Sequence, residues 1–422
     1  MGKVILSVNA GSSSVKVNVY SLENPPVEIA AANVSGLTAP PSIFKYNHGS
    51  SHQKHEIEER IKSPQEAFKY ILKRLLHDEE LQVVGSNADY AYVCHRVVHG
   101  GDLEAEVVIH EKTFSYLETL QDLAPLHNTS ALEIIKTCLE EVPSAKSVAY
   151  FDTTFHQCLP EYIKAYPINP EIAKSKMLRK YGFHGISFSF ILRSVSEFLK
   201  QPISKTNMIA LHLGSGASIC AIRNGKSIET TMGLTPLSGL PGATRSGDID
   251  ASLVFHYTSE AGKLSSSSTK EMHISKAEEI LNKQSGWKAL TGTTDFSQIG
   301  TENPPSEMHK LAFDIFVDRI VGFIGNYFVK LDGNIDAMVF AGGIGEQGAL
   351  LRRVIVEKCR CLGFAMDDRA NSAGIAKKDQ TVIDISQNSS QRPAVLICQT
   401  DEAFEMAYQC MNKPPREEPP NI

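Results

Sequence analysis

The segment VNAGSSSVKVNVY, residues 8–20, sets a polar loop between two apolar strands and decides how the chain begins to fold. The preceding VILSV (4–8) is apolar enough for a buried strand. The valines of residues 15–19 alternate with polar side chains, the period-2 pattern of a strand with one buried face. The loop, with Gly11 and three serines, is longer than a tight hairpin needs. It is either a polar hairpin loop or a cradle in which backbone N–H groups, hydroxyls and the nearby Lys16 bind an anion such as phosphate.

A second unit of the same kind lies at residues 208–225, MIALHLGSGASICAIRNG. Aligning Gly214 with Gly11 places LHLGSGA beside VNAGSSS, each after one apolar strand and before another. Two such loops predict a duplicated fold with two facing lobes, each with a phosphate-binding hairpin. Chance similarity between two short Gly-Ser loops is the alternative.

The composition is that of a globular protein, with 42% hydrophobic and 21% charged residues among 422. A net charge of -6 argues against a nucleic-acid partner, because nucleic-acid binding usually requires a basic surface. The eight cysteines include no C-x-x-C pair, which indicates reduced thiols and a cytoplasmic protein. No apolar run approaches the roughly 18 residues of a membrane span, so we expect no membrane association.

A glycine-rich turn, AGGIGEQG at 341–348, lies between an apolar strand and a helical pattern. Its glycines match G-x-G-x-x-G, and Asp367 and Asp368 follow at a distance suited to a ribose contact, so a nicotinamide-dependent oxidoreductase is one alternative. The same geometry suits any nucleotide whose phosphate or ribose approaches a helix N-terminus. The dinucleotide motif usually opens its domain, whereas this turn lies in the last quarter of the chain.

Basic and acidic side chains recur beside glycines or at strand ends. The segments that carry them are HRVVHGGD (95–102) with Arg96, PLHN (125–128) with His127, FDTTFH (151–156) with Asp152, YGFHGISF (181–188) with His184, and TRSGDID (244–250) with Arg245. Singly, each has a structural interpretation as a surface arginine or a core histidine. Together with two Gly-Ser hairpins they suit a phosphoryl group and its metal, because phosphoryl transfer needs mainly positioning and charge neutralisation. Neither a G-x-x-x-x-G-K-[ST] loop nor the protein-kinase motifs are present.

The sequence resembles the acetate kinase family, within the superfamily of acetate and sugar kinases, chaperone ATPases and actin. The resemblance runs from VNAGSSSVK to QTDEAFEMA through HRVVHGG, APLHN, FDTTFH, YGFHG, HLGSGAS, TPLSGL, TRSGDID and AGGIGE. It implies an α/β fold of duplicated ribonuclease-H-like βββαβαβ lobes facing a central nucleotide cleft. The N-terminal lobe would comprise residues 1–152, joined by a C-terminal helix at 403–422, and the nucleotide-binding lobe residues 153–402. The family is homodimeric.

The resemblance also implies a reaction, the reversible transfer of the ATP γ-phosphoryl group to acetate, giving acetyl phosphate and ADP, with Mg²⁺ or Mn²⁺. The catalytic residues carried over are Asp152, Arg96, Arg245, His184 and His127. Arg96 would bind the acetate carboxylate, and the methyl pocket would consist of Val98, Leu126, Phe183 and Pro236. The metal residues would be Asn9, Asp152 and Glu402. Phosphate would meet Ser12, Ser14, Lys16, His212, Leu213, Gly214, Ser215 and Gly216, and the adenosine would meet Asp295, Phe296, Ser297, Gly343, Ile344, Gly345, Glu346 and Gln347.

Several positions depart from the family pattern. Ser215 stands where the family usually has Asn, Ser297 where it has Arg, and Gln347 where it has Asn. YGFHGTSH appears as YGFHGISF, with Ile186 and Phe188. Since the changes gather around the nucleotide, we expect looser nucleotide discrimination. A propionate or butyrate kinase of the same superfamily, or a nonenzymatic nucleotide-binding module, would also carry motifs of this kind.

Overall fold

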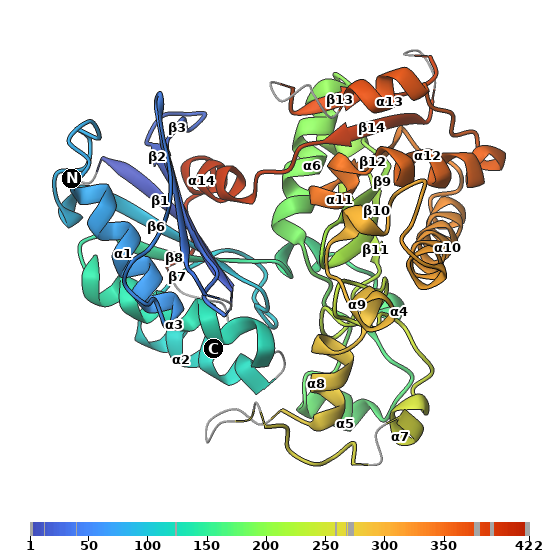
Figure 1. Cartoon of the computed structure of the whole chain (residues 1–422), viewed down its shortest axis with the longest axis horizontal. Coiled ribbons are helices and arrows are strands. Elements are labelled where there is room, and N and C mark those ends of the chain that lie inside the picture. Colours follow the sequence, from blue (N-terminus) through green and yellow to red (C-terminus); the bar gives the residue numbers. More distant parts are fainter. Residues whose placement is uncertain are drawn as a thin grey trace. The chain divides into compact units, whose positions relative to one another are not determined.

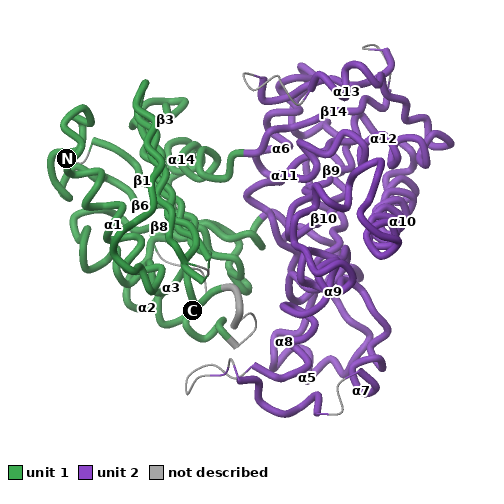
Figure 2. The backbone as a smooth tube through the Cα atoms, viewed as in Figure 1, with its two compact units in different colours: residues 1–154, 401–422 green, residues 155–400 purple. Residues whose placement is uncertain are grey.

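The computed structural model describes residues 3–11, 13–38, 40–122, 125–257, 260–266, 268, 274–374, 380–388 and 392–417, and of residues 122 and 125–127 the backbone. Ser12 and the side chains of Leu126 and His127 therefore lie outside the described part of the chain. The chain divides into two compact units, Met1–Thr154 with Asp401–Ile422, and Phe155–Thr400 (Figure 2). The first unit ends at residue 154 where 152 was expected, and the second ends at residue 400 where 402 was expected.

The first unit is built on one mixed sheet. Its strands are β1 (Val4–Ala10), β2 (Ser14–Ser21), β3 (Glu28–Ser35), β4 (Ile43–His48), β5 (Ser51–Glu56), β6 (Tyr90–Val97), β7 (Val107–Val108) and β8 (Lys146–Phe151). They lie in the order β5-β4-β3-β2-β1-β6-β8-β7. β1 to β5 form an antiparallel meander, β1, β6 and β8 are parallel, and β7 is antiparallel to β8. Its helices are α1 (Pro64–Leu76), α2 (Glu111–Thr119), α3 (Pro125–Glu141) and α14 (Glu402–Asn412).

The opening hairpin forms as its residue pattern predicts. Val15, Val17 and Val19 are fully buried, and β1 pairs with β2 from Val4 opposite Ser21 to Ala10 opposite Val15. Helices α1 and α3 cover one face of this sheet and α14 covers the other (Figure 1).

The C-terminal helix is shorter than the sequence resemblance implies. The expected span is 403–422, but α14 begins at Glu402 and ends at Asn412. The Asp401 side chain caps its start by accepting a hydrogen bond from the Phe404 N–H at 2.9 Å. Two prolines follow Lys413, and proline cannot continue a helix because it lacks an N–H and clashes with the preceding turn.

The second unit is built on a six-stranded sheet. Its strands are β9 (Met208–Leu213), β10 (Ala217–Arg223), β11 (Lys226–Thr230), β12 (Ala337–Ala341), β13 (Val382–Asp384) and β14 (Ala394–Cys398). They lie in the order β11-β10-β9-β12-β14-β13 (Figure 1). Its helices are α4 (Glu161–Lys164), α5 (Pro170–Ser175), α6 (Gly185–Phe198), α7 (Leu253–Tyr257), α8 (Lys276–Lys283), α9 (Gly286–Thr291), α10 (Glu307–Lys330), α11 (Gly342–Gln347), α12 (Ala349–Lys358) and α13 (Asp368–Gly374).

The two units repeat one topology, which confirms the predicted duplication. In the first unit, β1, β2 and β3 form an antiparallel meander, and β6 and β8 lie beyond β1 and parallel to it. In the second, β9, β10 and β11 form the same meander, and β12 and β14 lie beyond β9 and parallel to it. Helices α1 and α3 precede β6 and β8, as α10 and α12 precede β12 and β14. Each unit is thus a βββαβαβ lobe, and in each unit a Gly-Ser loop joins the first two strands.

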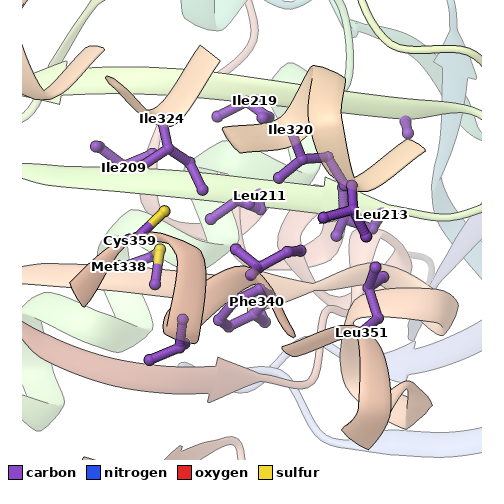
Figure 3. Packing of buried hydrophobic residues seen from close by; sticks show 14 of the residues in the cluster. Ile209, Leu211, Leu213, Ile219, Ile320, Ile324, Met338, Phe340, Leu351 and Cys359 are labelled. Atoms are coloured by element: carbon purple, nitrogen blue, oxygen red, sulfur yellow. The ribbon is translucent and has the colours of Figure 1, made fainter. Parts of the chain in front are cut away.

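The core of the second unit lies between its sheet and α10. Figure 3 shows Ile209, Leu211 and Leu213 of β9 packed with Ile320 and Ile324 of α10, all essentially without solvent exposure. This packing fixes the strand whose end leads into the Gly-Ser loop. Among the described residues, no helix combines the length and apolarity needed to cross a membrane.

Candidate active site

Four predicted site residues of the first unit meet at one edge of its sheet. Asn9 lies on β1, Arg96 on β6, Asp152 directly after β8, and Glu402 opens α14. The carboxyl ends of parallel strands lie at one edge of a sheet, so residues at these ends converge. This set has the place in the fold at which α/β proteins usually bind ligands.

Arg96 holds the cluster together. Its Nε and Nη2 donate to Oδ1 and Oδ2 of Asp152 at 3.0 and 2.8 Å, a bidentate pair. Its Nη1 lies 3.2 Å from Oε2 of Glu402 and donates to Oδ1 of Asn9 at 3.4 Å. Asn9 also donates from Nδ2 to Oε2 of Glu402 at 3.1 Å.

The cluster carries two carboxylates and one guanidinium. Burial alone would lower the pKa of Arg96, but the charges of Asp152 and Glu402 outweigh it and hold the pKa above its usual value. Asp152 is only 1% exposed. The cluster therefore holds the Arg96 guanidinium beside carboxylate and amide oxygens, the kind of ligand that hard metal ions prefer.

Two residues that the sequence analysis did not single out support the loop after β6. Asn128 accepts from the His99 N–H and donates to the His99 carbonyl, both at 2.9 Å. A Cβ added at Gly100 would lie 2.5 Å from the ring of Phe151, so only glycine fits there. Asn128 stands next to His127 in the PLHN motif, and this adjacency was the only sequence signal for it.

In the second unit, two histidine rings stack. His184 has φ +59° at the start of α6, a left-handed conformation, and its ring centroid lies 4.3 Å from that of His212 near the end of β9. Nδ1 of His184 is hydrogen-bonded to Oγ of Ser218 at 2.8 Å. This hydrogen bond fixes the orientation of the His184 imidazole, so Nε2 points away from Ser218.

Arg245 lies against the second Gly-Ser loop. A Cβ added at Gly216 would be 2.7 Å from Nη2 of Arg245, so the guanidinium passes directly over this glycine. Nη1 of Arg245 donates to the carbonyl of Pro236 at 3.1 Å. The Ala243 N–H donates to the Ser215 carbonyl at 2.9 Å, which ties the arginine loop to the Gly-Ser loop.

A cavity of about 670 Å³ adjoins this loop within the second unit. It is walled by Ser215, by residues 294–297 and 300–302, and by the turn from α11 into α12. Of the residues expected at the adenosine, those that line it are Asp295, Phe296, Ser297, Gly343, Ile344 and Gln347. Further lining residues, outside the predicted adenosine contacts, are Thr294, Gly300, Thr301, Glu302, Ala349, Leu350 and Gly348, the last of which belongs to the G-x-G-x-x-G motif.

Three predicted contacts lie away from this wall. Glu346 turns its carboxylate to Thr400, whose N–H and hydroxyl both donate to Oε1 at 3.1 Å, and burial raises the pKa of Glu346. Gly345 is buried beneath the turn, and Leu213 belongs to the hydrophobic core.

The remaining predicted residues occupy ordinary positions on their elements. Ser14 begins β2, and Lys16 is exposed opposite Asn9 on the neighbouring strand. Val98 is half-buried just beyond β6, and Phe183 is buried before α6. His212 and Gly214 lie at the end of β9 and in the loop after it.

The topology is not that of a nicotinamide-binding fold. The Rossmann fold has its glycine turn after the first of its parallel strands. Here the turn follows β12, and the preceding three strands of the sheet are antiparallel. Asp367 caps α13 by accepting from the Ala370 N–H at 2.7 Å, so its carboxylate serves the protein backbone.

Comparison with known proteins identifies the family. Residues 4–408 match the family model described as the Acetokinase family. A probable acetate kinase of Emericella nidulans is 64% identical over 409 residues, covering 97% of each chain. Two solved structures each cover 97% of this chain and 99% of their own: a propionate kinase from Francisella tularensis (32% identity, TM-score 0.83) and an acetate kinase from Porphyromonas gingivalis (28%, 0.81). The chain therefore belongs to the acetokinase family and is a phosphotransferase with a carboxyl group as acceptor.

Proposed function

We propose that this protein is an acetate kinase that transfers the γ-phosphoryl group of ATP to acetate, giving acetyl phosphate and ADP. One observation carries the proposal beyond family membership. Ser215 lines the cavity and its carbonyl binds the Arg245 loop, so the Gly-Ser loop links a nucleotide-sized cavity to a cation. A nucleotide whose base lies in the cavity would extend its phosphates along this loop towards Arg245.

The basic residues have complementary roles in this proposal. Arg245, His184 and His212 stabilise the negative charge of the phosphoryl group as it transfers, and the sequence resemblance assigns His127 to the same step. Arg96 binds the acetate carboxylate. The sequence resemblance assigns Val98, Leu126, Phe183 and Pro236 to the methyl group of acetate.

The chemical step needs little from the protein beyond alignment. An acetate oxygen attacks the γ-phosphorus, the bond to the β,γ-bridging oxygen breaks, and ADP leaves with that electron pair. Acetate is already ionised at neutral pH, so no general base is required. Holding the two reactants in line supplies much of the rate acceleration.

The oxygen atoms of Asn9, Asp152 and Glu402 fit a magnesium ion. Mg²⁺ prefers carboxylate and amide oxygens, and these three side chains gather around the guanidinium of Arg96, with Asn9 and Glu402 at Nη1 and Asp152 at Nε and Nη2. Mn²⁺ takes the same oxygen ligands. When bound, the ion would neutralise charge on the nucleotide phosphates.

A hydroxamate assay tests the proposal. Acetate, ATP and Mg²⁺ should give acetyl phosphate, and Arg245→Ala should lower kcat by roughly 10³-fold, as expected for an arginine that stabilises the transition state. The matched control is Arg319→Ala, because Arg319 is exposed on α10 and its one ion pair within the described part of the chain is with the exposed Asp318. A folded Arg245→Ala variant that loses less than tenfold would contradict the assignment.

Propionate is the second candidate acceptor. The propionate kinase of Francisella tularensis is as similar in fold as the acetate kinase of Porphyromonas gingivalis. The same assay run with propionate compares kcat/KM for the two acids. A higher value for propionate would reassign the substrate within the same reaction.

We also infer that nucleotide selection is loose. None of the described lining residues is Lys or Arg, and Ser297 donates its hydroxyl to Asp295 at 2.7 Å. A base in the cavity therefore meets no cation, so GTP should support activity within about 10³-fold of ATP in kcat/KM. A stricter preference would contradict this, and activity with pyrophosphate alone would overturn the nucleotide assignment.

The protein is further proposed to act as a cytoplasmic homodimer. All eight cysteines lie in the described chain as free thiols, which fits a reducing compartment. Four large apolar side chains on and beside α7 are exposed by 38 to 76%: Ile249, Leu253, Phe255 and Tyr257. A second copy would cover such a surface. Light scattering of the purified protein should give twice the chain mass of 46.3 kDa, and a monomer would contradict the proposal.

A further inference from the structure

Arg352 is a fully buried arginine directly behind the glycine turn of the cavity. It lies on α12 and has no measurable solvent exposure. Among the described residues it makes no ion pair. Burial lowers its pKa to about 10, with Glu346 opposing the shift, so the guanidinium stays charged at neutral pH.

Among the described residues, the hydrogen bonds of its side chain are made with two places in the chain. Nη1 donates to the carbonyls of Gly345 and Glu346 at 2.6 and 2.8 Å. Nε and Nη2 donate to Oδ1 and the carbonyl of Asn371 at 2.7 and 3.1 Å. Asn371 is itself buried on α13 and donates from Nδ2 to the Ala349 carbonyl at 2.9 Å.

The two bonds from Nη1 satisfy carbonyls that the end of helix α11 leaves without partners. Helix α11 is only six residues long, and its last carbonyls have no following turn to bond. Transferring a charged side chain from water into the protein interior costs free energy, so a buried arginine at this position implies a requirement that an apolar side chain could not meet. That requirement is a fixed path for residues 343–350.

The conformation of this turn shapes one wall of the cavity. Six of its lining residues belong to this turn: Gly343, Ile344, Gln347, Gly348, Ala349 and Leu350. Glycines at 343, 345 and 348 restrict the backbone less than other residues would, so contacts from outside the turn help to define its conformation. The side chains of Arg352 and Asn371 bind the two carbonyls before Gln347 and the one after Gly348.

We propose that Arg352 and Asn371 are positioning residues that hold the nucleotide-facing wall of the cavity and thereby set nucleotide affinity, without contact with the nucleotide. The inference rests on the proposed function, in that the cavity binds the nucleotide. It assigns the pair no part in acetate binding.

The variants Arg352→Met, Arg352→Lys and Asn371→Leu test this assignment. In Arg352→Met, KM for ATP should rise about 30-fold, equivalent to ~2 kcal/mol of binding, while KM for acetate changes less than threefold. Lysine can reach the Gly345 and Glu346 carbonyls but not both Asn371 acceptors, so Arg352→Lys should recover part of the ATP affinity. In the reverse direction, KM for ADP should rise and KM for acetyl phosphate should not. Arg319→Met, the same change at an exposed position of α10, should leave all these constants unaltered.

A merely structural role would give a different result. It would lower the melting temperature and the active fraction, with KM for ATP unchanged in the molecules that remain folded. That outcome, or a parallel rise in KM for acetate, would overturn the inference. If Arg352→Met does not fold, the milder Arg352→Lys and Asn371→Leu variants decide the question by the same comparison. Calorimetric titration with ATP keeps the two proposals separable, because a wild-type protein that binds ATP without making acetyl phosphate would refute only the proposed function.

Discussion

Replacing Asp152 with Asn tests the energetic importance of the Arg96 cluster. The carboxylate is 1% exposed and makes two charge-assisted hydrogen bonds to Arg96. Asparagine keeps the size and one acceptor, but its NH₂ group would face the Nη2 donor. Arg96 would keep only Glu402 at 3.2 Å as an ionic partner. Breaking one side of a buried pair destabilises by about 3–5 kcal/mol.

The expected shift in melting temperature follows from that free energy. For a unit of 150–250 residues, 1 kcal/mol corresponds to about 2–4 °C, so Asp152→Asn should lower the melting temperature by roughly 6–20 °C. Asp332→Asn is the matched control. Asp332 also pairs with an arginine, Arg223 at 2.8 Å, but its side chain is 81% exposed. An exposed pair contributes about 0–1 kcal/mol, so the control should shift by no more than about 4 °C.

Scanning calorimetry of the two variants and the wild type provides the measurement. If Asp152→Asn melts within about 2 °C of the wild type, or if both variants shift equally, burial of the pair is not what makes it strong. Acetyl phosphate formation below the melting temperature then gives the separate effect on activity. We expect kcat to fall in Asp152→Asn and to stay unaltered in Asp332→Asn.

Three further predictions concern selectivity, pH and binding. Val98→Ala should enlarge the methyl pocket and shift kcat/KM towards propionate by roughly tenfold or more; an unchanged acetate-to-propionate ratio would remove Val98 from the pocket. Burial lowers the pKa of His156 to about 4. The histidine of the unfolded chain is therefore protonated at a higher pH than that of the folded chain, so the free energy of unfolding should fall by about 3 kcal/mol as pH drops from 6.5 to 4. In urea unfolding, the free energy of unfolding of His156→Gln should depend less steeply on pH than that of the wild type. An equal pH dependence would contradict the assignment. Trp287, the only tryptophan, lies 5.4 Å from the Phe296 ring on the cavity wall, so ATP should change its fluorescence saturably, and constant emission during binding seen by calorimetry would contradict that placement.

Local patterns predicted the strands and their ends well. Alternating valines set the buried face of β2, and the apolar strands before Arg96 and Asp152 placed both residues at strand ends, where parallel pairing brings them together. The correspondence of Gly11 with Gly214 predicted the repeated topology. These features depend on neighbours along the chain, so the sequence carries them directly.

Contacts between distant segments could not be predicted in the same way. Glu346 belongs to the glycine turn, yet its carboxylate faces Thr400, 54 residues away. Nothing in the sequence distinguishes Arg352 from the adjacent Arg353, although one is buried and the other pairs with the exposed Glu302. Which of two adjacent arginines points inward depends on how α12 packs against α13, and that is a property of the folded unit.

The order of synthesis gives the last helix a particular importance. Strands β1, β6 and β8 leave the ribosome early, but Glu402 and the Ala403 carbonyl that accepts from Ser7 at 2.8 Å come from α14. About 250 residues separate the two parts of this unit, which at 5–20 residues per second is roughly 12–50 s of translation. Throughout that interval the growing chain has Arg96 with only one of its two carboxylates. Completion of the proposed magnesium-binding set therefore waits for the final steps of translation, and a chain that stops before residue 402 lacks the Glu402 carboxylate of that set, however well its earlier strands have folded.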